Sequence, residues 1–137
     1  MVNLIRSWIL YIGSGCVSLI VYLLGGIDLL IETLIVLMLI DYATGLLKGY
    51  KNKNISSNRS YQGIGKKMVM LLIVAAATKI DPLIPGIAIR TAVAMFYVAT
   101  EFLSILENAA ILGVPIPTKL KVALEQCRDK QDIKKQG

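Results

Sequence analysis

The sequence contains no histidine among its 137 residues. Histidine is the most common general base and metal ligand, so its absence removes the usual starting point of an enzyme site. The chain also lacks a glycine-rich phosphate loop and the G-x-S-x-G motif of serine hydrolases. We therefore expect no enzymatic activity, no cofactor and no metal.

Cysteine is also scarce. Cys16 lies in an apolar segment and Cys127 in a charged tail. This wide separation predicts neither a disulfide framework nor a metal cluster. We expect two free thiols.

Charged residues make up only 18% of the chain and hydrophobic residues 55%, with a mean hydropathy of +0.66. A small soluble domain needs a more polar surface. Four apolar segments approach the ~20 residues that cross a bilayer as a helix. They are 8–24, 27–47, 68–84 and 86–112. The composition predicts an all-α, polytopic membrane protein with about four transmembrane helices, or three if segment 68–84 is re-entrant or interfacial.

The loop 48–67 carries six basic residues and no acid. These are Lys48, Lys51, Lys53, Arg59, Lys66 and Lys67. By the positive-inside rule the loop is cytoplasmic. Its simplest partner is anionic lipid, because no aromatic platform for nucleic acid is evident.

Two segments on each side of this loop place both termini in the cytoplasm. We expect a transmembrane domain over 1–113 and a basic tail with a short helix over 114–137, because Pro115 and Pro117 end the fourth segment. Gly25 and Gly26 allow only a tight turn between the first two segments. We expect those segments to be antiparallel neighbours.

Several acids lie inside the apolar segments, where an ionised residue at a helix centre costs about 2.5–3.5 kcal/mol. Asp41 is predicted to be a helix-end charge beside the basic loop. Glu101 lies deeper, with no basic loop nearby. We expect it to be protonated, or to serve as a proton or cation site.

A polar stripe follows helical spacing along the last segment: Arg90, Ala94, Tyr97, Glu101, Ser104 and Asn108. The stripe either packs against sibling helices through hydrogen bonds of ~0.6–2 kcal/mol, or faces other subunits or water in an oligomer. Both interpretations stay open. Gly45 and Gly49 have the spacing that lets helices approach closely.

Several different short motifs follow one another between positions 41 and 124. They are D-Y-A-T-G from Asp41, S-S at Ser56, G-I-G-K-K from Gly63, Asp81, E-F-L-S-I-L-E-N from Glu101 and G-V-P-I-P from Gly113. Together they resemble the toxin-secretion and phage-lysis holins of Gram-positive bacteria and their phages.

The resemblance implies a homo-oligomer in the bacterial cytoplasmic membrane that opens lesions and releases an endolysin or a toxin. It implies no catalytic residue. Candidate positions for helix packing or pore behaviour are Asp41, Gly45, Arg90, Tyr97, Glu101, Ser104, Glu107 and Asn108.

Two alternatives remain. One is a small homo-oligomeric ion channel or exporter that uses Glu101. The other is a non-conducting antiholin or membrane scaffold that binds a true holin.

Overall fold

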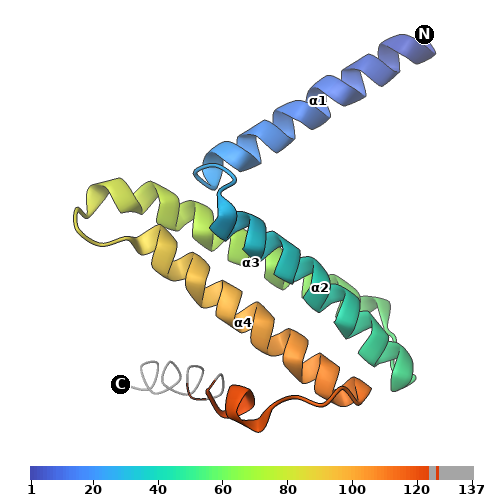
Figure 1. Ribbon diagram of the computed structural model, residues 1–137. Helices are drawn as coiled ribbons and strands as arrows, with labels where there is room; N and C mark the ends of the chain where they lie inside the picture. The colour runs from blue at the N-terminus through green and yellow to red at the C-terminus, as the bar shows by residue number, and fades with distance from the viewer. Residues whose placement is uncertain (124–125, 127–137) are drawn as a thin grey trace.

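The computed structural model describes residues 1–123 and 126. Within these residues the chain forms helices and no strands (Figure 1). The elements are α1 (Val2–Leu23), α2 (Leu29–Lys51), α3 (Ser57–Ile80), the 3₁₀ turn η1 (Asp81–Leu83) and α4 (Ile89–Leu112). The prediction of an all-α fold is confirmed.

Helices α2, α3 and α4 form a bundle in which consecutive helices run in opposite directions (Figure 1). Its apolar core occupies the half near the start of α2 and the end of α3. The core residues are Leu24, Ile31, Leu34, Met38, Val74 and Ala94. The other half of the bundle is joined by polar side chains instead.

Helix α2 begins at a cap and continues further than its apolar residues do. The Asp28 carboxylate accepts a hydrogen bond of 3.0 Å from the Ile31 N–H. The helix continues to Lys51, since no proline interrupts it and lysines favour a helix C-terminus. The predicted loop 48–67 is therefore wrong in extent, because only residues 52–56 separate α2 from α3.

Helix α3 begins eleven residues before the predicted segment 68–84. Three helices are long and apolar enough to cross a membrane, namely α1, α2 and α4, among the residues the structure describes. Helix α3 has 24 residues, about 36 Å of helix, so its length is sufficient. Its basic first half makes it more polar than the other three helices, and it is not among those apolar enough to cross a membrane. That α3 spans the membrane stays a prediction.

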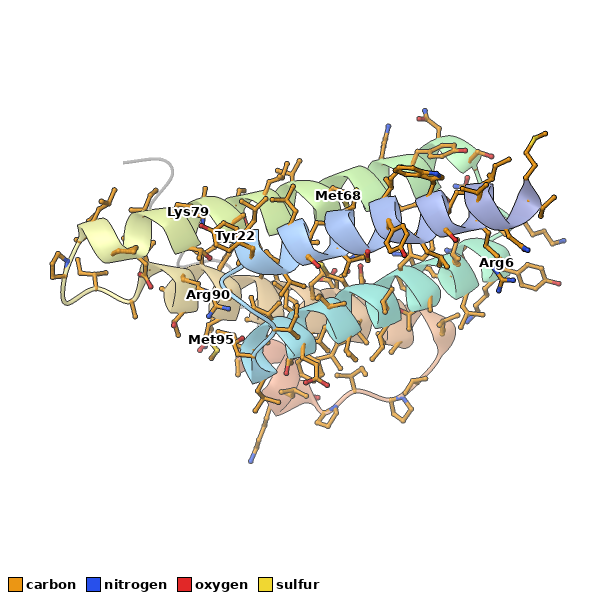
Figure 2. The ribbon with its side chains drawn as sticks, turned by 90° about the horizontal axis from the view of Figure 1, so that it is seen from above. Arg6, Tyr22, Met68, Lys79, Arg90 and Met95 are labelled. Atoms are coloured by element: carbon orange, nitrogen blue, oxygen red, sulfur yellow. The ribbon has the colours of Figure 1, made fainter. Side chains whose placement is uncertain are left out.

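Helix α1 diverges from the bundle instead of packing along α2 (Figure 1). None of its residues is buried. The turn after it is tight, with φ of +79° at Gly25 and +95° at Gly26. The expected antiparallel pairing with α2 is wrong, because these two left-handed residues set α1 at a wide angle to α2. Near this turn the Lys79 ammonium lies 4.0 Å from the centre of the Tyr22 ring (Figure 2).

Helix α4 ends where the sequence predicted. Gly113 closes it in the left-handed region with φ of +93°. After the two prolines, a short helical stretch covers 118–123, and the Pro117 carbonyl accepts from the Leu120 N–H at 3.0 Å. The rest of the predicted tail, apart from position 126, lies outside the described residues.

Candidate functional site

The midpoints of α2, α3 and α4 meet at three ionisable side chains. Asp41, Lys67 and Glu101 each lie about 15 Å from the nearer end of their helix. If these helices cross a bilayer with an apolar core about 30 Å thick, the three side chains lie near its centre. We call them the Asp41–Lys67–Glu101 triad.

Lys67 joins the two acids. Its ammonium donates to Asp41 Oδ2 at 2.8 Å and also to Glu101 Oε2. The exposed fractions of the side chains are 14% for Lys67, 16% for Asp41 and 3% for Glu101. One α3 residue therefore holds α2 and α4 together at a largely buried site.

Asn108 extends the triad along α4. Its Nδ2 donates to Asp41 Oδ1 and to Thr44 Oγ1, both at 3.1 Å. A Cβ at Gly45 would lie 3.8 Å from the same nitrogen, so Asn108 passes close to the α2 backbone there. Asp41, Thr44 and Gly45 lie on one helical face, and the D-Y-A-T-G motif thus forms the α2 surface that receives Asn108.

These contacts offset the cost of placing charges in an apolar bundle. An uncompensated charge at a helix centre costs about 2.5–3.5 kcal/mol. Within the described residues, every buried side-chain nitrogen and oxygen has a hydrogen-bond partner. Two acids share one lysine, so both ion pairs depend on Lys67.

Three sequence predictions need correction here. Asp41 is near the middle of α2 and not at its C-terminal end, since the helix runs on to Lys51. Glu101 does have a basic partner, Lys67. Lys67 itself does not face lipid, because α3 begins early enough to place it in the helix with its side chain directed inward.

The other basic residues predicted to face lipid differ among themselves. Lys51 donates to the Ile111 carbonyl at 2.8 Å and so joins the ends of α2 and α4. Lys53 and Lys66 are exposed, and Lys48 is half-buried. The prediction for the Arg59 side chain lies outside what the structure describes.

The polar stripe of α4 faces inward. Ala94, Glu101 and Asn108 are buried, and Arg90, Tyr97 and Ser104 are half-buried. Within a single chain the stripe thus packs against sibling helices. A role in an oligomer stays a prediction, and Glu107 lies exposed, off this face.

Arg90 belongs to a second cluster at the opposite end of the bundle (Figure 2). It donates to the Leu24 carbonyl at 2.9 Å and to Asp28 Oδ2 at 2.7 Å. The hydrogen bond from Arg90 lowers the pKa of the Asp28 carboxyl, and the Ile31 N–H adds to this effect. Asp81 Oδ1 accepts from the Ile89 N–H at 2.6 Å at the start of α4. The cluster fixes the α1–α2 turn against α4.

A cavity of about 620 Å³ adjoins the triad and extends to the connection between α2 and α3. Asp41, Lys67, Glu101 and Asn108 line its inner part, and Lys48 and Lys66 also line it. Such a polar cavity can admit water or a polar ligand to the middle of the bundle.

The sequence profile of the bacteriophage holin family matches residues 18–129. The chain belongs to this family. It is 36% identical over 114 residues to a protein named probable holin of Bacillus phage phi105, covering 82% of this chain and 84% of the relative.

Other relatives of this holin family member come from bacteria. An uncharacterized protein of Clostridium perfringens is 40% identical over 132 residues, or 95% of each chain. One of Listeria monocytogenes is 42% identical over 102 residues, covering 73% of this chain and 72% of the relative. No solved structure matches this chain. The family and the three apolar helices indicate a membrane protein, and the family suggests a non-enzymatic one.

Proposed function

We propose that this holin family member assembles into homo-oligomers in the bacterial cytoplasmic membrane and opens lesions there. The lesions release a cytoplasmic endolysin or, alternatively, a toxin. Family membership carries the proposal, and the buried triad supports it with a physical route. In a single chain the polar atoms face inward, which suits a state that does not conduct.

Lesion formation needs a polar protein surface that can line a water-filled opening. The bundle already contains such surface on α2, α3 and α4 around Asp41, Lys67 and Glu101. Separation of α3 from its neighbours exposes these groups, and water then solvates the charges that Lys67 balances in the closed bundle. Association between subunits makes this separation of α3 favourable.

In this arrangement the α2–α3 connection and the tail face the cytoplasm, as the positive-inside rule predicts. The endolysin or toxin is a functional partner that passes through the lesion without contacting a binding site. Anionic lipids surround the basic end of the bundle.

Inducible expression in bacteria, with and without a cytoplasmic endolysin, tests the proposal. We expect the membrane potential to collapse abruptly after induction in both cultures. Turbidity should then fall rapidly only in the culture that holds the endolysin. An unchanged potential and a retained endolysin would contradict the proposal.

Two variants separate this outcome from a selective channel. Glu101→Gln changes the triad, and Glu107→Gln is its control, since it removes an equal charge from the exposed side of α4. A selective channel that uses Glu101 would lose ion flux in the first variant and never release the endolysin. An antiholin would delay lysis when it is expressed together with a true holin.

A further inference from the structure

The cavity of about 620 Å³ has a distinctive charge arrangement. Its lining includes three lysines and two carboxylates. Both carboxylates, Asp41 and Glu101, are bound to Lys67. The ammonium groups of the remaining lysines, Lys48 and Lys66, have no hydrogen-bond or ion-pair partner among the residues that the structure describes.

The outer lining adds neutral hydrogen-bonding groups and no acid. Asn54 and Ser60 supply an amide and a hydroxyl beside the two lysines. The first turn of α3 also borders the cavity, where the Ser60 N–H donates to the Ser56 carbonyl at 3.2 Å. A helix N-terminus carries a partial positive charge that favours anions. The outer cavity thus favours an anion.

The position of the cavity indicates where the anion comes from. Lys48 lies one turn before the end of α2, which is long and apolar enough to span a membrane. The ends of spanning helices lie at the level of lipid headgroups. Lys66 lies deeper, one residue before Lys67 in α3, and reaches this level only through its long side chain. The phosphates found at highest local concentration at that depth are those of phospholipids.

We propose that this cavity binds the phosphate of an anionic phospholipid headgroup, with the ammonium groups of Lys48 and Lys66 as its ligands. The cavity volume lies within the range of small-molecule sites, about 300–1,000 Å³. The glycerol of the headgroup reaches toward Asn54 and Ser60. This inference requires a membrane location and is independent of lesion formation.

The phosphate occupies the basic mouth of the cavity, directly outside the triad. Its negative charge offsets the positive charges of the two lysines. A bound headgroup thereby links the end of α2 to the first half of α3, the helix that carries Lys67. The lipid stabilises the closed bundle from its cytoplasmic end.

Lipid binding to the purified full-length chain in neutral detergent tests this inference. Short-chain phosphatidylglycerol is titrated against Lys48→Gln/Lys66→Gln and against the matched control Lys53→Gln/Lys119→Gln. Both variants lose two positive charges, but the control residues do not line the cavity. Each lysine near an anionic lipid contributes about 1 kcal/mol, so we expect about 30-fold weaker binding in the cavity variant. The control should stay within about twofold of the parent.

Three further arms complete the test. Phosphatidylcholine of equal chain length should bind weakly to all proteins, and Lys48→Arg/Lys66→Arg should restore phosphatidylglycerol binding. Inorganic phosphate should fail to displace the lipid at comparable concentration. Equal losses in the two glutamine variants would overturn the inference by showing diffuse attraction. Displacement by inorganic phosphate would overturn the assignment to a lipid.

Discussion

At the scale of the residue, Lys67 is the side chain on which the buried charges depend. Replacing it by methionine leaves Asp41 and Glu101 close together without a cation. Breaking a buried ion pair by removing one partner costs about 3–5 kcal/mol. We expect Lys67→Met to lower the free energy of unfolding in detergent by about this amount.

The combined variant Lys67→Met/Asp41→Asn/Glu101→Gln provides the matched comparison. It removes the charges together, and replacing a complete buried set with neutral groups is often close to neutral. We expect it to recover most of the lost stability. If Lys67→Met alone is as stable as the parent, the triad does not hold the helices together.

Asn108 contributes through hydrogen bonds without charge. Asn108→Leu preserves the approximate volume but removes the donors to Asp41 and Thr44. Polar contacts between membrane helices contribute ~0.6–2 kcal/mol each, so we expect a loss of about 1–3 kcal/mol in detergent unfolding. Thr100→Val serves as the control, since the Thr100 hydroxyl donates to the Phe96 carbonyl of its own helix. We expect this substitution to cost about 0.5 kcal/mol or less.

Single residues also show where sequence reasoning succeeds. Asp41, Glu101 and Asn108 were predictable as important because polar groups are costly inside apolar segments. Lys67, the partner of both acids, was not predictable in this way. It belongs to a basic run that is equally compatible with a solvated loop. Only the early start of α3 at Ser57 places this lysine inside the bundle.

At the scale of the element, the turn between α1 and α2 depends on two glycines with different surroundings. A Cβ at Gly25 would lie 2.9 Å from Thr78 Cγ2 and 3.1 Å from Arg90 Nε, whereas a Cβ at Gly26 would meet nothing within 4 Å. Alanine at either site costs about 1–2 kcal/mol for its left-handed backbone.

We expect Gly25→Ala to cost at least about 1 kcal/mol more than Gly26→Ala, because it also crowds α3 and α4. Unfolding in detergent measures both. Equal losses would show that the turn does not pack against the bundle as described.

Helix α3 is the element whose extent was hardest to predict. Its apolar residues suggested a start at 68, but polar residues from Ser57 onward are helical too. The hydrophobic pattern locates apolar helix faces. It cannot show where a helix begins or ends when that end consists of polar residues. The same limit explains why α2 extends to Lys51.

Labelling tests whether α3 crosses the membrane. In a background without Cys16 and Cys127, cysteines are placed at Ser57 and Leu83, both exposed positions at opposite ends of α3 and η1. We expect an impermeant thiol reagent to label Leu83→Cys in intact cells and Ser57→Cys only after permeabilisation. Labelling of both from the same side would contradict a spanning α3.

At the scale of the whole molecule, the bundle is divided into an apolar half and a polar half. Residues around Ile31, Val74 and Ala94 hold the first half by burial. The triad and Asn108 hold the second half by hydrogen bonds and ion pairs. Fold class and approximate helix positions followed from hydropathy. The divergence of α1 did not, because hydropathy identifies a long apolar helix without indicating which neighbour it packs against.

The central claim is that the assembled chain opens lesions large enough for a protein. The most direct measurement reconstitutes the purified chain in anionic lipid vesicles that hold a small dye and an endolysin-sized protein. The account predicts that both leave the vesicles together once the protein exceeds a threshold density. Release of dye or ions while the enclosed protein stays inside would contradict the account and indicate a channel.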